Sequence, residues 1–296
     1  MRNIYIDRIL ADLKAHVPEA GCDIAEVRQV FSEFYKKYQS PLLCQTKAVL
    51  GEDFIATWVF DEYFDRTRAL IFFHGGGFSI GSTDDHMELI ARLAHESRIP
   101  ILSVDYRLAP EHRFPSDLDD ALDAYQWLQS QGFSPNDIMF VGISAGANLV
   151  LSLLLKLKQA KLAMPRGSVV ISPEPHINLS VPSLEYNANR DWITKERVLS
   201  IQKSYLPDTV SVDDPLISPL NGDFGEMPPM LIQVGDAEIL FDQVVLFFQK
   251  LKSQSVDVNL EVWPDMVHCW HIFARDVPQG QEAIQSIARF ISLTFE

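Results

Sequence analysis

A serine flanked by glycines constrains the fold of this chain more than any other feature. Residues 142–146 read Gly-Ile-Ser-Ala-Gly, between an apolar run at 138–141 and a long apolar-periodic run that starts at Ala147. The first run predicts a buried strand and the second a helix, so the serine lies on the turn between them. Glycines let the backbone crowd together on both sides of so sharp a turn. The pattern favours a nucleophilic Ser144 with an exposed hydroxyl over an ordinary tight turn.

Predicted strands and helices alternate on both sides of this turn. Short, continuously apolar runs indicate strands that are buried on both faces, and they occur at 69–73, 101–104, 138–141, 169–171, 231–234 and 260–263. Helical patterns lie at 85–98, 118–129, 147–162, 244–252 and 283–293. This alternation predicts an α/β fold in which a mostly parallel sheet carries helices on both faces.

Two regions depart from the alternation. The first forty residues predict two amphipathic helices, one over residues 4–15 and one that follows Asp23 as its N-cap. Residues 173–219 hold several prolines and one helical stretch at 195–205, but no clear strand. So long a break within a compact domain usually marks a functional or inserted segment.

Composition excludes several classes of protein. The net charge of −15 over 296 residues argues against nucleic-acid partners and against anionic lipid surfaces. No apolar run approaches the ~20 residues that span a bilayer, and the N-terminus lacks the apolar core of a signal peptide. Cys22, Cys44 and Cys269 are too few and too scattered for a disulfide framework, which predicts a reducing, cytoplasmic location. A homodimer through an edge strand or the last helix stays open.

A serine nucleophile needs hydrogen-bond donors for the oxyanion that forms on attack. Three consecutive glycines follow the strand at 69–73 and the histidine after it, where backbone N–H groups can approach a ligand closely. A glycine hairpin is the alternative, and a phosphate loop is disfavoured because no Gly-Lys-Ser/Thr follows. The N–H after the nucleophile supplies a second donor. The predicted oxyanion hole is therefore formed by Gly75, Gly76, Gly77 and Ala145.

In an α/β fold whose nucleophile lies on such a strand-to-helix turn, the catalytic residues follow one another along the chain as serine, acid and histidine. We therefore expect the orienting carboxylate, and then the base, after the late strands. His268 follows the strand at 260–263 and is favoured over His271, which we expect to pack or to face solvent. Five further histidines are expected to be structural: His16, His86, His95, His112 and His176. Three carboxylates follow the strand at 231–234, and residue type alone leaves Asp236, Glu238 and Asp242 open.

Four segments together resemble the hormone-sensitive-lipase-like family of α/β-hydrolases. They are His-Gly-Gly-Gly-Phe at 74–78, Asp-Tyr-Arg-Leu-Ala-Pro-Glu-His-Arg-Phe-Pro at 105–115, the serine motif continued to 149, and 235–242 with Met-Val-His at 266–268. The resemblance implies a carboxylester hydrolase with Ser144 as nucleophile and His268 as base. It also selects Glu238 as the acid, because this residue stands four positions before an aspartate with a leucine between them.

The resemblance further implies a domain arrangement. Residues 1–45 and 173–219 form a helical cap, and residues 46–172 and 220–296 form the catalytic core. Aromatic side chains of the cap are candidates to line the pocket: Phe31, Phe34, Tyr186, Trp192 and Tyr205.

The chain departs from the family pattern at four places, one of which is Ala147, where a glycine is common. The family usually has aspartate where this chain has Ile143, and it often has aspartate at the position of Glu238. It also usually has an aromatic residue and an aspartate after Ser-Pro, and residues 172–179 of this chain differ from that pattern. Two alternatives to an esterase stay open: an amidase or deacetylase with the same triad, and a small-molecule receptor without turnover. We expect neither a metal nor an organic cofactor, since no His-Glu-x-x-His spacing occurs.

Overall fold

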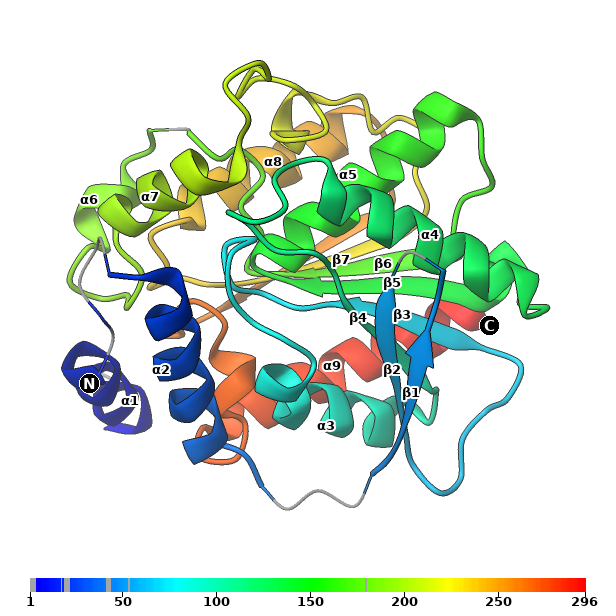
Figure 1. Ribbon diagram of the computed structural model, residues 1–296, viewed down its shortest axis with the longest axis horizontal. Coiled ribbons are helices and arrows are strands. Elements are labelled where there is room, and N and C mark those ends of the chain that lie inside the picture. Colours follow the sequence, from blue (N-terminus) through cyan, green and yellow to red (C-terminus); the bar gives the residue numbers. More distant parts are fainter. Residues whose placement is uncertain (1–3, 17, 19–21, 41–43, 53, 179) are drawn as a thin grey trace.

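An eight-stranded sheet forms the centre of the computed structural model, which describes residues 4–16, 18, 22–40, 44–52, 54–178 and 180–296 (Figure 1). The strands are β1 (Gln45–Leu50), β2 (Ile55–Phe60), β3 (Ala69–Phe73), β4 (Ile101–Asp105), β5 (Ile138–Ile143), β6 (Gly167–Ile171), β7 (Met230–Gly235) and β8 (Val258–Trp263). Their order is β1-β2-β4-β3-β5-β6-β7-β8. β1 and β2 are antiparallel to their neighbours, and the pairs from β4 to β8 are parallel.

Helices cover both faces of the sheet (Figure 1). One face carries α3 (Met87–Ser97) and α9 (Pro278–Phe295), and the other carries α4 (Ser116–Ser130), α5 (Ala145–Ala160) and α8 (Phe241–Ser253). Alternate residues of β5 enter the two cores: Phe140 packs with α4 and α5, and Met139 with α3 and α9. Every residue of β5 is buried, as expected for a strand covered on both faces. The predicted α/β architecture is confirmed.

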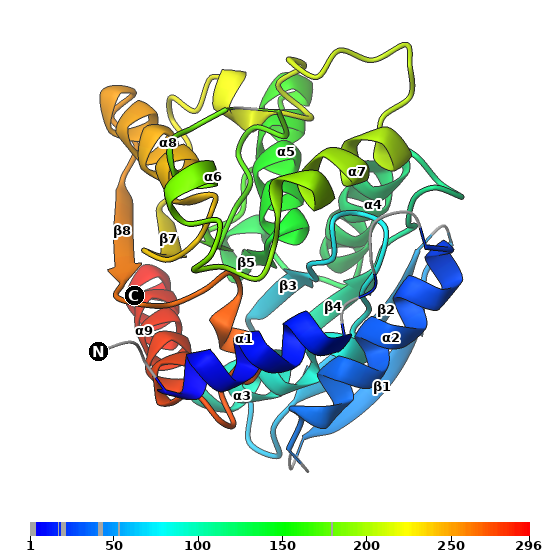
Figure 2. The same cartoon turned by 90° about the vertical axis from the view of Figure 1, so that its left-hand side faces the viewer.

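The remaining helices gather at one end of the sheet. They are α1 (Ile4–His16), α2 (Ile24–Lys37), α6 (Ser183–Tyr186) and α7 (Lys195–Tyr205). Short 3₁₀ turns at various places in the fold span Asp84–His86, Pro135–Asp137, Pro219–Asn221 and Trp270–Phe273. Figure 2 faces that end and shows α1 and α2 below, and α6 and α7 above, the ends of the central strands. The Asp23 side chain accepts from the Ala25 N–H at 2.9 Å, so the predicted N-cap of α2 is confirmed.

All six predicted strands are present, but sequence analysis missed β1 and β2. Five of the six residues of β1 are exposed, and only Ala56 and Val59 of β2 are buried. These two strands form the edge of the sheet, where burial is one-sided and no continuous apolar run is needed.

Candidate active site

Ser144 lies on the tight turn that joins β5 to α5, with φ 55° and ψ −121°. The two glycines of the motif are required by close backbone contacts. A Cβ on Gly142 would lie 2.2 Å from the Gly146 carbonyl oxygen, and a Cβ on Gly146 would lie 2.0 Å from that of Phe73. Any larger residue would push β3, β5 and α5 apart. The turn therefore holds the serine in a conformation that non-glycine residues adopt only under constraint.

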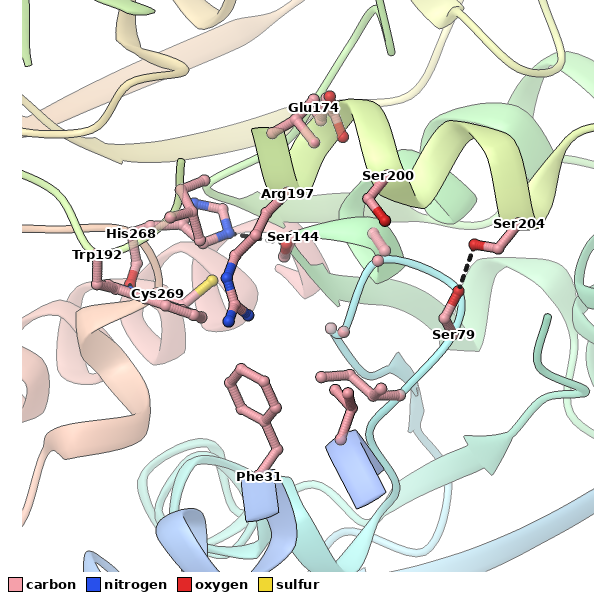
Figure 3. A pocket seen from close by; sticks show the side chains of 18 of the residues that line it. Phe31, Ser79, Ser144, Glu174, Trp192, Arg197, Ser200, Ser204, His268 and Cys269 are labelled. Atoms are coloured by element: carbon pink, nitrogen blue, oxygen red, sulfur yellow. Dashed lines mark hydrogen bonds between the residues drawn. The ribbon is translucent and has the colours of Figure 1, made fainter. Parts of the chain in front are cut away.

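Three side chains from three loops meet at this turn. The Ser144 Oγ lies 2.8 Å from His268 Nε2 (Figure 3). On the other side of the ring, His268 Nδ1 lies 3.0 Å from Glu238 Oε2. The carboxylate faces Nδ1, so that nitrogen donates and Nε2 presents its lone pair to the serine hydroxyl. Glu238 is fully buried and His268 nearly so. The structure thus brings the three residues singled out by the sequence into one hydrogen-bonded chain.

Glu238 is fixed through its second oxygen. Oε1 accepts the Gly235 N–H at 2.6 Å and the Ser172 hydroxyl at 2.8 Å. Ser172 follows β6 and Gly235 ends β7, so the two neighbouring parallel strands hold the carboxylate from either side. These two donors leave Oε2 free to face His268.

The other two candidate acids lie elsewhere. Asp236 Oδ1 pairs with the Arg190 guanidinium at 3.1 Å. Asp242 accepts the Ser183 N–H and the Tyr186 hydroxyl, each at 2.8 Å. Both carboxylates therefore bind the 173–219 segment, and neither makes a hydrogen bond to the imidazole.

The two late histidines have opposite electrostatics. Burial alone would lower the pKa of His268, but the adjacent Cys269 and the Glu238 carboxylate raise that pKa well above its ordinary value. His271 is fully buried, its Nε2 lies 2.7 Å from Gln233 Oε1, and burial lowers its pKa to about 3. His271 is therefore neutral and packed inside the protein, as expected.

The glycine loop after β3 carries the proposed oxyanion donors. Gly76 and Gly77 have φ values of 123° and 58°. Within the described residues, no acceptor takes the N–H of Gly76, Gly77 or Ala145. The Gly75 N–H instead donates to His86 Nε2 at 3.2 Å. The Gly75 N–H is thus already engaged, whereas those of Gly76 and Gly77 have no acceptor among the described residues. The oxyanion role of the four predicted donors stays a prediction.

His86, expected to be structural, supports this loop from beneath. Its Nδ1 lies 3.0 Å from the Ser82 carbonyl oxygen and donates to it, so Nε2 accepts from Gly75. Burial, with the neighbouring His74, lowers the pKa of His86 to about 4, so it is neutral and can accept at neutral pH. The His74 carbonyl accepts the Tyr106 hydroxyl at 2.8 Å, and the two rings stack at 4.2 Å.

Sequence analysis missed a second carboxylate that binds the backbone of His268. Asp191 is buried, and it accepts the His268 N–H and the Ile239 N–H, each at 3.0 Å. Asn187 donates to the Glu238 carbonyl at 2.8 Å. No motif surrounds either residue, and both lie in the segment without strands, so nothing in the sequence ties them to the site. Burial raises the pKa of Asp191 to about 6.

A pocket of about 300 Å³ opens over Ser144 and His268. Most of its lining is apolar, and Figure 3 shows Phe31 of α2 and Trp192 of the 173–219 segment among its walls. Of the five candidate aromatic residues, only these two line it. Phe34 packs on Phe273, Tyr205 stacks on Phe78, and Tyr186 is half exposed.

Further features bear on cofactors and membranes. Across the described ranges, no group of three histidine, cysteine, aspartate or glutamate residues is placed to hold a metal ion. In the same residues, no helix combines the length and the apolar character that crossing a membrane requires. Cys22, Cys44 and Cys269 are free thiols.

Comparisons with known proteins show which family the chain resembles in sequence and in fold. The family model described as "alpha/beta hydrolase fold" matches residues 70–272. An esterase of Acinetobacter venetianus is 37% identical over 225 residues, which cover 76% of this chain and 74% of that protein. An ethyl acetate hydrolase of Pseudomonas putida is 35% identical, covering 73% and 70%. The crystal structure of an esterase from the bacterial hormone-sensitive lipase family superposes with a TM-score of 0.95 at 31% identity, covering all of both chains.

The chain belongs to the α/β-hydrolase family, in its hormone-sensitive-lipase-like group. It is a serine carboxylester hydrolase. The alternative of a receptor without turnover is thereby set aside.

Proposed function

We propose that Ser144, His268 and Glu238 form the catalytic triad of this esterase. The proposal depends on one observation above all: the continuous hydrogen-bonded chain from the serine hydroxyl through the imidazole to the buried carboxylate. His268 Nε2 takes the hydroxyl proton as Ser144 Oγ bonds to the ester carbonyl carbon. Glu238 holds the imidazole in the required tautomer and stabilises the imidazolium that forms.

The oxyanion is bound by the N–H groups of Gly76, Gly77 and Ala145. They are unengaged within the described chain, and Ala145 begins α5, whose N-terminal field favours negative charge. Each such donor contributes on the order of 3 kcal/mol of transition-state stabilisation. The tetrahedral intermediate then collapses: the C–O bond to the alcohol breaks, and the imidazolium protonates the leaving oxygen. Water attacks the acyl-enzyme in the same way, with His268 taking its proton.

Small acyl esters are the substrates that we propose. A pocket of about 300 Å³ is at the lower end of the range for ligand sites, and its mostly apolar lining favours uncharged groups. The ethyl acetate hydrolase among the relatives supports a short acyl chain.

The cap is proposed from residues 1–45 and 173–219, over a core of 46–172 and 220–296. Contacts between the two segments support it. Arg197 of α7 donates to the Pro18 carbonyl and lies 5.5 Å above the Phe31 ring, and Trp192 lies 6.2 Å from Phe31. Helix α2 and the insertion thus meet over the pocket.

A chain-length series of p-nitrophenyl esters tests this function. We expect the wild type to hydrolyse acetate and butyrate esters faster than long-chain esters, and Ser144→Ala to hydrolyse none above background. A phosphonate inhibitor should add mass to the peptide that contains Ser144. Labelling of another peptide contradicts the nucleophile assignment, and faster turnover of a matched amide than of its ester favours the amidase alternative.

Location and assembly are also proposals. Three unpaired thiols fit a cytoplasmic location. β8 is an edge strand, and its Val262 is 43% exposed, so it is the surface that we propose for homodimer formation. Sedimentation velocity of the wild type and of Val262→Lys tests the dimer: a monomer at all concentrations contradicts it.

A further inference from the structure

Glu174 is a buried carboxylic acid that the proposed triad does not use. It follows β6, in the segment where the chain departs from the family pattern, and its residue surface is 9% exposed. The side chain lines the pocket that also contains Ser144 and His268. Figure 3 shows it on the opposite side of the serine from Phe31.

The backbone at this position is held firmly. The Asn148 side chain, one turn into α5, donates to the Glu174 carbonyl at 2.7 Å and to the Ile217 carbonyl at 3.1 Å. Asn148 is therefore a fixed link between the nucleophile helix and the chain that carries Glu174. The carboxyl group has a rigid base from which it reaches the pocket.

One oxygen of this carboxyl group lacks a partner: Oε1 is buried and has no hydrogen bond to any of the described residues. A buried polar atom without a partner is destabilising, and such atoms are rare unless a ligand or water completes them. Burial raises the pKa of Glu174 to about 8, against an opposing effect of His268. At neutral pH the group is a neutral acid, with one O–H donor and one carbonyl acceptor.

We propose that Glu174 is a specificity-determining residue that hydrogen-bonds a hydroxyl group of the substrate, so that this esterase favours small hydroxylated esters over plain alkyl esters. A hydroxyl can donate to the Glu174 carbonyl oxygen or accept its O–H. An alkyl group in the same place displaces water and leaves the carboxyl without hydrogen bonds. This inference rests on the proposed reaction at Ser144.

Three matched esters locate the hydroxyl that is recognised. Ethyl butyrate is the alkyl reference, ethyl 3-hydroxybutyrate carries the hydroxyl on the acyl side, and 2-hydroxyethyl butyrate carries it on the alcohol side. The kcat/KM of each is measured by pH-stat with the wild type, Glu174→Met and Glu174→Gln. Methionine keeps the side-chain length without hydrogen bonds, and glutamine keeps a donor and an acceptor.

The wild type should prefer one hydroxylated ester over ethyl butyrate by about tenfold, the size of one buried hydrogen bond. Glu174→Met should abolish or reverse that ratio, mainly through KM, and Glu174→Gln should retain most of it. A ratio that is equal in the wild type and in Glu174→Met overturns the inference, as does a uniform loss of all three activities with the ratio unchanged. Failure of the wild type on all three esters instead contradicts the proposed esterase reaction.

Discussion

Replacing Glu238 by glutamine should inactivate the enzyme by fixing the wrong tautomer of the base. Two donors converge on Oε1, the Gly235 N–H at 2.6 Å and the Ser172 hydroxyl at 2.8 Å. In Glu238→Gln the amide oxygen must take that position, because an NH₂ group there would face the Gly235 N–H. The NH₂ group is then directed at His268 Nδ1.

The substitution should also change which of the two ring nitrogens of His268 carries the proton. An amide donor opposite Nδ1 requires that nitrogen to be the acceptor, so the imidazole proton moves to Nε2. Nε2 then donates toward Ser144 Oγ, 2.8 Å away, and no longer takes its proton. The imidazolium would also lose its buried counter-charge. Removal of the equivalent carboxylate in a serine protease lowers kcat by about 10⁴, and we expect a loss of the same order here.

The assay is burst-phase and steady-state hydrolysis of p-nitrophenyl butyrate, with near-UV circular dichroism as the check on folding. Asp242→Asn is the matched control, because Asp242 follows the same strand but binds Ser183 and Tyr186 instead of the imidazole. We expect that control to keep kcat within about threefold, since its hydrogen bonds lie at the cap. A folded Glu238→Gln that keeps more than a tenth of wild-type kcat, or loses less than Asp242→Asn, refutes the reasoning.

Ser144→Ala should lower kcat by roughly 10⁴ to 10⁶, measured with an active-site-titrated wild type as reference. On its acid limb, kcat/KM should fall tenfold per pH unit, as one group is protonated. The midpoint should lie above about 6.5, the ordinary pKa of a histidine, because the pKa of His268 is raised; a lower midpoint contradicts this. Asp191→Asn should lower the free energy of unfolding in urea by about 2 kcal/mol, since one buried N–H loses its acceptor. Glu174→Gln should gain stability relative to the wild type as pH rises from about 4.5 to about 8. The folded-state pKa of Glu174 is above its unfolded value, so wild-type stability falls over that range; parallel curves would contradict it.

Residues whose role depends on the local backbone could be predicted from the sequence. The turn at 142–146 needs glycines because two carbonyl oxygens approach within 2.2 Å of where a Cβ would lie, and that constraint appears directly as a sequence pattern. The parallel strands were equally visible, because strands covered on both faces read as unbroken apolar runs. Ser144, Glu238 and His268 each follow one of these parallel strands, so all three lie at the end of the sheet where the strands finish.

Residues whose role depends on contacts with distant parts of the chain could not be predicted from the sequence. Gly75 was grouped with its two neighbours because the residue type is identical, and only the position of His86 shows that its N–H is already engaged. Asp191 lies 77 residues from the histidine whose N–H it binds, in a stretch with no periodicity. The edge strand β1 and its neighbour β2 were missed for a different reason: their one-sided burial leaves too weak an apolar pattern in the sequence.

The 173–219 segment, which the sequence showed only as an irregular insertion, both lines the pocket and holds the backbone of His268. Trp192 forms a wall of the pocket, and its indole N–H donates to the His268 carbonyl at 2.8 Å. The preceding Asp191 binds the His268 N–H, so two adjacent residues hold both backbone groups of the base. Displacing this segment to admit a substrate would therefore also release the imidazole. Because productive geometry at His268 requires the segment in place, binding and catalysis should respond together to substitutions there, with KM and kcat changing in the same variants.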